Sequence, residues 1–498
     1  MQYYLGIDIG TTSTKVVAFS KAGEVLTSWS CPYEMYHPQP NWSEQDPDEV
    51  FRAVINCSNK VISSLASHSP LLVAFSSAMH GLLAINNEGK PITNCIIWAD
   101  NRAAEIAEDL RSTEWGDKIY QLTGVPIHSM TPLCKLLWLK KNDPAIFAKA
   151  HKFISIKEYI FYKIFGEYVV DTSVASATGL LNLRTLKWDE EILDFLEMAY
   201  SSLSQVVSTK SKFIYANSVL PGVEKQWLIP EGTPFIIGGS DGALANLGTG
   251  AVENSSMAIS IGTSGAARIV IDKVETDLKM RTFCYHVKDN WYIVGGASNN
   301  GAVVFEWLKD KLLETQETFT QLSERAETVA PGSDDLIFIP YVLGERSPIW
   351  NSNARGIFFG LNINHTKAHL VRACMEGIIY ALYSIAKILL EKRVITEIYA
   401  TGGFTHSSLW LQMLADTCNI KVLVSDAVES SALGAVMIGM EALDIEPLPP
   451  KESLSFYEPN ILNHEIYMRG FEKFERIYET SKEELTNESS PLLQMQLK

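Results

Sequence analysis

The sequence is poor in the residues that hold disulfide-rich domains and zinc sites together. Its 498 residues include only seven cysteines, an odd number, and no two of them form a CxxC pair. Disulfide frameworks and structural zinc sites depend on paired, closely spaced cysteines. The pattern therefore predicts free thiols in a reducing compartment.

The chain also lacks a basic cluster and an excess of positive charge. It has 42 Lys and Arg against 58 Asp and Glu, which gives a formal net charge of −16. Nucleic acids and anionic membranes bind basic surfaces, so we expect neither as a partner. ATP remains compatible, because a few backbone N–H groups, one lysine and a metal ion can form a local phosphate site.

No targeting segment or long apolar run is apparent. The chain begins with a strand-like segment over residues 3–7 and has no basic or apolar leader. No stretch approaches the ~18 apolar residues of a membrane span, so we expect a soluble cytoplasmic protein. Single hydrophobic cores stop growing near about 250–300 residues, so the length predicts two domains.

Two segments about 250 residues apart resemble each other. Residues 5–13 are LGIDIGTTS, residues 257–265 are MAISIGTSG, and an apolar run follows each. Both predict a strand, a Gly-Thr turn and a second strand, which together form a β-hairpin. A repeat of this kind indicates a duplicated domain. We expect an N-terminal domain over residues 1–245 and a C-terminal domain over 246–498.

Strands alternate with helices around both hairpins, which predicts an α/β protein with mixed sheets. In the first half, Asp46 and Pro47 indicate the start of a helix that runs to about residue 65, with Glu49 reaching back to the cap. The further elements expected are strands over 71–76, 396–400 and 421–425, and helices over 368–392, 407–417 and 431–442.

The helix over 368–392 is apolar except for one stripe, so it should be largely buried. The polar stripe consists of Arg372, Glu376, Tyr383, Lys387 and Glu391. Residues 481–498 are mostly polar, and we expect them to fray.

The first hairpin turn contains the groups that bind polyphosphate. Gly10 lets a ligand approach the backbone closely, and Asp8 before the turn is placed to hold Mg²⁺ directly or through water. The hydroxyl and amide donors and the nearby positive charge come from Thr11, Thr12, Ser13 and Lys15. An ordinary hairpin with solvated threonines would have the same residues, so the turn alone leaves both interpretations open.

The second hairpin offers a similar donor-rich turn made by Gly262, Thr263 and Ser264. Ser260 stands where Asp8 stands in the first copy. Two donor turns with one carboxylate between them suit one metal ion rather than two.

A candidate general base follows another apolar strand. In residues 235–242, FIIGGSDG, Gly239 and Gly242 leave space for a substrate to approach Asp241. Phosphoryl transfer to a hydroxyl needs an acceptor for its proton. An Asx-turn after a strand has the same pattern, so the spacing alone does not decide the role.

Polar residues that could bind an acceptor follow two strands of the first half. Met79 and His80 end one strand, and Trp98, Asp100 and Arg102 follow another. An indole offers an apolar face, a carboxylate hydrogen-bonds hydroxyls, and a guanidinium also binds carboxylates. A lone histidine that bonds a backbone carbonyl is the alternative for His80.

The motif ATGGF at residues 400–404 precedes a predicted helix in the second half. Gly402 and Gly403 permit a nucleotide to approach the backbone closely. Gln412 and Asp416 on that helix are either ligand-binding, capping or solvated groups.

Together these motifs resemble the actin-like ATPase superfamily and, within it, the FGGY carbohydrate kinases. Residues 130–142, MTPLCKLLWLKKN, fit the first signature of that family, and residues 356–361, GIFFGL, through Glu376 fit the second. Cys374 departs from the usual small or aliphatic residue, which affects packing and no chemistry. The resemblance extends from residue 4 to about 476.

The resemblance implies an α/β fold of two actin-like (ribonuclease H-like) domains with mixed sheets and an interdomain cleft. It implies ATP and Mg²⁺ as cofactors, with Asp241 as the general base and Asp8 on the metal side. The two turns would hold the transferring phosphoryl group, and Gly402 and Gly403 would contact the adenosine. The expected partners are a small sugar or sugar acid and ATP, and a homodimer stays open.

Several segments resemble the gluconokinase branch of the family, namely residues 98–102, 156–159 and 295–301. The segment Met79-His80-Gly81 also resembles the xylulokinase branch. The resemblance implies D-gluconate, phosphorylated on its 6-hydroxyl, with D-xylulose as the alternative. A carboxylate substrate needs a cation nearby, for which the sequence offers Arg102, Lys157, His80 and His128 without ranking them.

Two other classes share some of these features. A chaperone or filament-forming ATPase has the phosphate hairpins, but it needs neither the candidate base nor the acceptor motifs. A non-catalytic sugar sensor is expected to have lost Asp8 or Asp241, and both are present.

Overall fold

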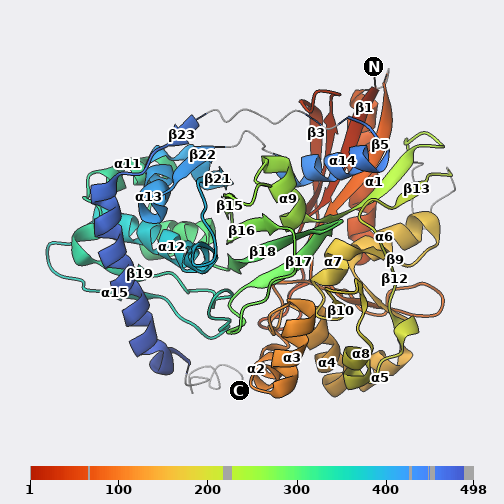
Figure 1. The fold of residues 1–498 in the computed structure, drawn as a ribbon, viewed down its shortest axis with the longest axis horizontal. Helices are drawn as coiled ribbons and strands as arrows, with labels where there is room; N and C mark the ends of the chain where they lie inside the picture. Colours follow the sequence, from red (N-terminus) through yellow and green to blue (C-terminus); the bar gives the residue numbers. More distant parts are fainter. Residues whose placement is uncertain are drawn as a thin grey trace. The chain divides into compact units, whose positions relative to one another are not determined.

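A computed structural model describes residues 2–65, 68–216, 227–424, 429–446, 448 and 455–486. The chain forms two compact units, each assembled from three separate stretches (Figure 1). Unit 1 comprises Met1–Glu253, Val270–Val294 and Ala427–Lys451, and unit 2 comprises Asn254–Ile269, Gly295–Asp426 and Glu452–Lys498.

A six-stranded mixed sheet forms the centre of unit 1, in the order β13-β14-β5-β1-β2-β3. Strand β1 pairs antiparallel with β2 and parallel with β5, and β5 pairs parallel with β14. The strands are β1 (Gln2–Ile9), β2 (Ser13–Phe19), β3 (Val25–Pro32), β5 (Ser69–Ser77), β13 (Lys212–Ile214) and β14 (Pro234–Ser240). Because β1, β5 and β14 are parallel, their carboxyl ends meet at one edge of the sheet, where ligands of α/β proteins commonly bind.

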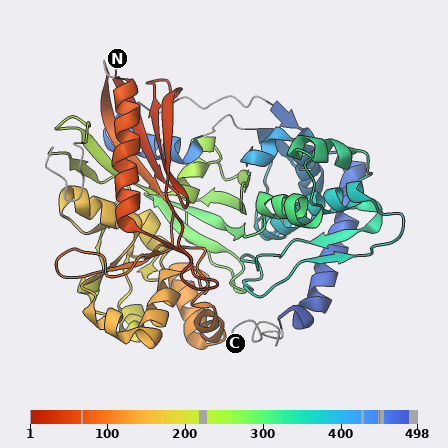
Figure 2. The same cartoon turned by 180° about the vertical axis from the view of Figure 1, so that it is seen from behind.

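Helices cover both faces of this sheet. Helix α1 (Pro47–Ser64) lies on one face, as Figure 2 shows, and α9 (Asp241–Thr249) and α14 (Ser430–Ala442) lie on the other, as Figure 1 shows. The predicted start of α1 is confirmed, because the Asp46 side chain accepts hydrogen bonds from the N–H groups of Asp48 and Glu49. The expected return contact of Glu49 is wrong, since its carboxylate accepts the hydroxyl of Tyr36 instead.

Most other elements of unit 1 surround a second apolar core, whose residues come largely from the part of the chain between β5 and β14, whereas α6 (Ile156–Phe165) packs into the core of the main sheet. The other helices of unit 1 are α2 (Ala104–Arg111), α3 (Glu114–Thr123), α4 (Pro132–Asn142), α5 (Pro144–Lys149), α7 (Thr172–Ser176), α8 (Glu190–Leu196) and the 3₁₀ turn η1 (Tyr200–Ser202). The short strands are β4 (Glu44–Gln45), β6 (Leu83–Ile85), β7 (Cys95–Ile96), β8 (Lys152–Ile154), β9 (Val169–Asp171), β10 (Leu181–Asn182), β11 (Lys187–Trp188), β12 (Gln205–Val207) and β17 (Phe283–Lys288).

The strands of unit 2 lie in the order β16-β15-β21-β22-β23. Strand β15 pairs antiparallel with β16 and parallel with β21, so the second predicted hairpin and the mixed sheet are confirmed. The five strands are β15 (Ser256–Ile261), β16 (Gly265–Ile271), β21 (Glu397–Thr401), β22 (Lys421–Val424) and β23 (Ser455–Tyr457). Strands β19 (Ile337–Ile339) and β20 (Ile357–Phe359) form a separate two-stranded sheet, and β18 (Trp291–Ser298) belongs to unit 2 from Gly295 onward. The helices are α10 (Ala302–Trp307), η2 (Leu308–Leu312), α11 (Phe319–Glu327), η3 (Ser333–Asp335), α12 (Lys367–Leu390), η4 (Gly403–His406), α13 (Ser408–Cys418) and α15 (Ile461–Thr486).

Helix α12 is the buried helix that the apolar pattern predicts. An 18-residue window of it has a mean hydropathy of 1.6, which is apolar enough to cross a membrane, contrary to the expectation that no stretch approaches this length. Within the protein, 83% of that window is buried, as expected of a core helix.

The first two residues of the predicted polar stripe of α12 are buried. Arg372 and Glu376 are only 3% and 2% exposed, and they form an ion pair of 2.9 Å. Gly332 N–H and the hydroxyl of Ser333 satisfy the Glu376 carboxylate, and the Arg372 guanidinium also donates to the hydroxyl of Tyr467. Burial of this pair is tolerated because its charges are hydrogen-bonded.

Helix α15 extends further than its polar composition predicts. Helix α15 continues to Thr486, so the expected fraying from residue 481 is wrong for residues 481–486. Residues 487–498, and residue 425 of the predicted strand over 421–425, lie outside the described residues.

Glu158 predicts a pH dependence of stability that can be measured. It completes the capping box of α6 by accepting the N–H of Ser155 at 2.6 Å, and burial raises the pKa of Glu158 to about 7. Between about pH 4.5 and 7 the folded state keeps the proton on Glu158, whereas the unfolded state releases it. The contribution of protonated Glu158 to the free energy of unfolding is therefore full below about pH 4.5 and is lost as the pH rises to about 7.

We expect Glu158→Gln to keep the capping box and to raise the free energy of unfolding by about 1–3 kcal/mol at pH 8. At pH 5 the increase in the free energy of unfolding should be much smaller, because folded Glu158 is then protonated and neutral like glutamine. Urea unfolding at both pH values measures the difference, with the exposed Glu190→Gln as the control. An equal effect at both pH values would contradict the expectation.

Candidate active site

The carboxyl ends of β1 and β14 bring Asp8 and Asp241 close together within unit 1. Asp8 lies beside Ser76 of β5, and Ser240, which precedes Asp241, lies beside Ser77. The two carboxylates interact: burial and then the charge of Asp241 raise the pKa of Asp8 to about 7. Asp241 is the first residue of α9, where the helix dipole favours a negative charge.

One oxygen of Asp8 fits a cation. Its Oδ1 is buried and has no hydrogen-bond partner among the described residues. A buried carboxylate oxygen without a donor, next to a second carboxylate, carries a cost that a divalent cation would remove. The arrangement therefore fits Mg²⁺ at Asp8.

The first hairpin turn is held by its carbonyl groups. The Tyr33 hydroxyl donates to the carbonyl of Gly10 at 2.5 Å, and the Gln45 amide donates to that of Thr11 at 2.5 Å. Tyr33 N–H donates to the carbonyl of Thr12 at 3.1 Å. Within the described chain, the N–H groups of Thr11 and Thr12 have no hydrogen-bond partner. Successive free N–H groups in a tight turn form an anion site.

The second hairpin turn is held in the same way. The N–H groups of Ala302 and Val303 donate to the carbonyls of Gly262 and Thr263 at 2.7 and 3.3 Å. The turn closes on itself where Gly262 N–H donates to the carbonyl of Ser264. The supports in both turns come from chain segments without a recognisable motif, which is why the sequence did not reveal them.

Lys15 has a partner that the sequence did not reveal. Its ammonium forms a salt bridge with Glu429, just before α14. The Lys15 side chain is 37% exposed, so it remains open to solvent on one side. A phosphate group would have to compete with this carboxylate for the ammonium.

Two of the predicted acceptor residues bond to other parts of the site. Trp98 donates its indole N–H to the hydroxyl of Thr11 at 2.8 Å, which connects the acceptor and phosphate residues. His80 has a φ of +68°, and its Nδ1 lies 2.8 Å from the carbonyl of Ala177, which is the contact expected of a structural histidine and occupies one of its two ring nitrogens. The carbonyl of His80 accepts a hydrogen bond from the buried Lys135. Met79, which precedes His80 in the chain, is half-buried.

Asp100 and Arg102 bond to each other. The Arg102 guanidinium donates to both oxygens of Asp100 at 2.9 Å and to Glu44 at 2.6 Å, and it stacks on Trp42 with 3.7 Å to the ring centroid. Asp100 is fully buried and also accepts the N–H of Ser43. Their contact with a substrate stays a prediction, and their visible effect is to order the loop that carries Trp98.

The other two cation candidates are also buried. Lys157 is 1% exposed and pairs with Asp171, and His128 is 3% exposed with its Nδ1 accepting the N–H of Met130.

In unit 2, the Gly-Gly turn after β21 lies against the second hairpin. Gly402 has a φ of +104°, and a Cβ atom there would lie 2.3 Å from the carbonyl oxygen of Ile261. A Cβ on Gly403 or on Gly262 would meet nothing within 4 Å, so both glycines border open space. This geometry leaves room for a ligand beside the turn.

Gln412 and Asp416 form a capping network. The Gln412 amide donates to Asp416 at 2.7 Å, and Asp416 also accepts the N–H of Asn460 and the amide of Asn463. Asp416 is 1% exposed. Of the alternatives that the sequence left open, capping is the one the structure supports.

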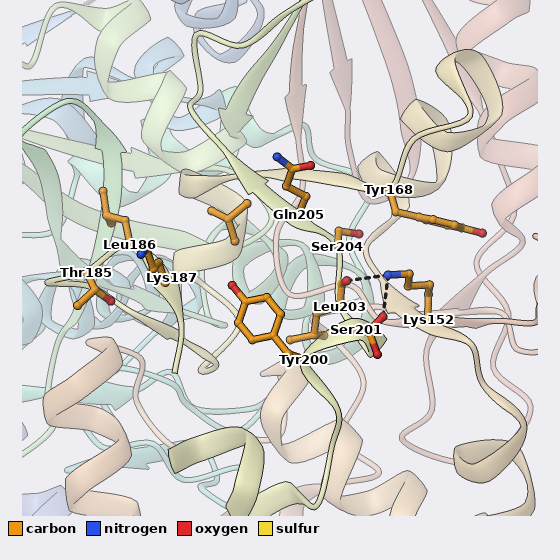
Figure 3. Close-up of a pocket in the computed structure, with 11 residues that line it drawn as sticks. Lys152, Tyr168, Thr185, Leu186, Lys187, Tyr200, Ser201, Leu203, Ser204 and Gln205 are labelled. Carbon is orange, nitrogen blue, oxygen red and sulfur yellow. Dashed lines mark hydrogen bonds between the residues drawn. The ribbon is translucent and has the colours of Figure 1, made fainter. Parts of the chain in front are cut away.

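A separate cavity of about 570 Å³ in unit 1 contains none of the predicted site residues (Figure 3). Among the lining residues, the Lys152 ammonium donates to the carbonyls of Ser201 and Leu203 at 2.7 and 2.9 Å, as the dashed lines in Figure 3 show. Lys187, Tyr168, Tyr200 and Gln205 are among the other lining residues.

Comparison with known proteins places this geometry in a family. Residues 3–248 match the N-terminal domain of the FGGY family of carbohydrate kinases, and residues 257–443 match its C-terminal domain. The gluconokinase of Bacillus licheniformis is 44% identical over 454 residues, covering 88% of this chain and 87% of that protein. The xylulose kinase of Staphylococcus xylosus is 32% identical over 442 residues, covering 88% and 90%.

Solved structures agree on the fold. The gluconate kinase of Lactobacillus acidophilus has a TM-score of 0.91 and 34% identity, covering 96% of this chain and 98% of that chain. A ligand-bound xylulose kinase of the same organism also has a TM-score of 0.91 and 34% identity, covering 97% and 99%. The predicted α/β fold of two actin-like domains is confirmed. The chain belongs to the FGGY family of carbohydrate kinases and is an ATP-dependent sugar kinase.

Proposed function

We propose that the protein transfers the γ-phosphoryl group of ATP to the 6-hydroxyl of D-gluconate, giving 6-phospho-D-gluconate. The observation that carries the kinase reaction is that the carboxylates of Asp8 and Asp241 lie within electrostatic reach of each other at the carboxyl ends of β1 and β14. The choice of gluconate is supported by 44% identity to a gluconokinase against 32% to a xylulose kinase. D-Xylulose is the second candidate, because the two Lactobacillus acidophilus structures match equally well.

In the proposed reaction, Asp241 accepts the proton of the attacking hydroxyl. A base at this position contributes about 10²–10⁴-fold to the rate when it lies within hydrogen-bond reach of the hydroxyl. The free N–H groups of the turn at Thr11 and Thr12 bind the transferring phosphoryl group, and Lys15 adds positive charge. Preorganised donors of this kind stabilise the charge that develops in transfer.

Mg²⁺ would be held by Asp8, directly or through water. When bound, it supplies neutralisation of the charge on the β- and γ-phosphates. The orphaned Oδ1 of Asp8 supports this assignment.

The nucleotide side belongs to the C-terminal domain in this proposal. The turn of Gly262, Thr263 and Ser264 binds phosphate, and Gly402 and Gly403 contact the adenosine. The open space beside Gly262 and Gly403 supports it. The domain limits of 1–245 and 246–498, and the cleft between the domains, remain predictions.

The acceptor side belongs to the N-terminal domain. Met79, His80 and Trp98 bind the sugar acid, and Asp100 and Arg102 hold the loop around it. The hydrogen bond from Trp98 to Thr11 supports a single site for acceptor and phosphate. A cytoplasmic enzyme with gluconate and ATP as its small-molecule partners is the corresponding physiological proposal.

A panel of acceptors tests the proposal. ADP release is measured with D-gluconate, D-xylulose, glycerol and buffer alone at equal concentrations of Mg²⁺ and ATP. We expect gluconate to give the highest kcat/KM. If xylulose stimulates ADP release and gluconate does not, the acceptor is wrong and the kinase reaction stands.

A further inference from the structure

The strand that leads to Asp241 is interrupted by a bulge. The register of β14 with β5 shifts between Ile236 and Gly239. At the bulge, Gly238 has a φ of +66°, and a Cβ there would lie 1.8 Å from the carbonyl oxygen of Phe75. Bulges next to active sites re-aim the side chains that follow them. The direction of the Asp241 side chain therefore depends on what holds this bulge.

A buried ammonium holds it. The Lys157 Nζ, on α6, donates to the carbonyls of Ile237 and Gly239 at 3.2 and 3.0 Å, on either side of Gly238. Its third contact is an ion pair of 2.5 Å with Asp171, whose side chain is 0% exposed. A lysine ammonium has three N–H donors. All three are used within the protein, so Lys157 is saturated and is not a free cation for a substrate.

A second element fixes the next residue of the strand. The Ser173 hydroxyl, on α7, accepts the N–H of Ser240 at 3.2 Å and lies 3.0 Å from its hydroxyl. Asp171 caps α7 by accepting the N–H of Val174 at 2.9 Å. The pair of Lys157 and Asp171 therefore ties two helices to the segment directly before Asp241.

The charges also act on one another. Burial lowers the pKa of Lys157, and the carboxylates of Asp171, Glu158 and Asp241 oppose this lowering. Asp241 is therefore within electrostatic reach of the buried ammonium.

We propose that Lys157 is a positioning residue for Asp241: it fixes the bulged end of β14 and thereby the direction of the Asp241 side chain. The inference rests on the proposed role of Asp241 as the base. In this proposal the buried ion pair of Lys157 and Asp171 contributes to phosphoryl transfer by holding the segment before Asp241, and not by contact with a ligand.

The test uses Lys157→Met and the double variant Lys157→Met/Asp171→Asn. The single variant leaves the Asp171 carboxylate buried without a partner and is expected to lose stability, whereas the double variant removes both charges. In the double variant, kcat should fall by about 10- to 100-fold, with the KM for gluconate and for ATP within about threefold of wild type.

Lys135→Met is the matched control. Lys135 is equally buried and also uses all three N–H donors within the protein, on the carbonyls of His80, Ile96 and Ile97. Its loss should lower stability and raise the KM for gluconate. A double variant of Lys157 and Asp171 that folds and has wild-type kcat overturns the proposal.

Asp241→Asn separates this inference from the proposed function. If Lys157 acts through Asp241, the Lys157 and Asp171 changes should cause little further loss in the Asp241→Asn background. If the Lys157 and Asp171 changes lower kcat by the same factor in the Asp241→Asn background as in the wild type, the positioning role is overturned and the proposed function stands. Near-normal turnover of Asp241→Asn itself overturns the base, and the positioning role with it.

Discussion

Asp241→Asn is expected to reduce kcat by about 10²–10⁴-fold, which is the contribution of a general base. The amide has nearly the same shape as the carboxylate but cannot accept the hydroxyl proton. Affinities for gluconate and ATP should stay near those of the wild type, because the residues proposed to bind them are unchanged.

Coupled measurement of ADP release gives kcat, and calorimetric titration of each ligand gives the affinities. Asp109→Asn, at an exposed position on α2, serves as the control and should leave kcat unchanged. A variant at position 241 that turns over at a near-normal rate would remove this residue from the mechanism. Loss of ligand binding together with turnover would instead indicate a structural role.

Gly238→Ala is expected to have the largest effect on stability. An alanine Cβ would lie 1.8 Å from the carbonyl oxygen of Phe75, in the adjacent strand. This contact can be relieved only if β14 and β5 move apart, which breaks the centre of the sheet in unit 1. Together with the cost of a positive φ, we expect a loss of at least about 4 kcal/mol in the free energy of unfolding, or failure to fold.

Gly232→Ala isolates the backbone part of this effect, so that the difference between the two variants gives the steric part. Gly232 also has a positive φ, +83°, but a Cβ there meets nothing within 4 Å. It should cost only about 1–2 kcal/mol, the backbone term. Denaturant unfolding of both variants gives the comparison, and equal losses would show that the close contact with Phe75 is not what requires glycine.

Local structure was predictable wherever near neighbours in the chain determine it. The Asp46 cap of α1, the two hairpins and the buried α12 follow from capping, turn and periodicity patterns within a few residues. The structure has each of them within one or two residues of the predicted ends. The prediction that the chain frays from residue 481 was wrong for residues 481–486, because it took polar composition as a sign of disorder.

The candidate site was predictable in its residues but not in their partners. Asp8, Asp241 and the two turns were identified by motif and resemblance, and the structure places Asp8 and Asp241 within electrostatic reach. The support of each turn by its carbonyls, from Tyr33 and Gln45 in the first, has no sequence signal. It depends on which strands and loops pack beside the turn.

By itself, the sequence determined the order of helices and strands, the two glycine turns and the presence of two carboxylates suited to kinase chemistry. Only the tertiary structure decided that Lys157 and Arg102, which the sequence offered as cations for a substrate, are buried against Asp171 and Asp100. The reason is physical: a motif records residues that are near in the chain. The state of a charge depends on burial and on partners, such as Lys15 and Glu429, that packing brings together from distant parts of the chain.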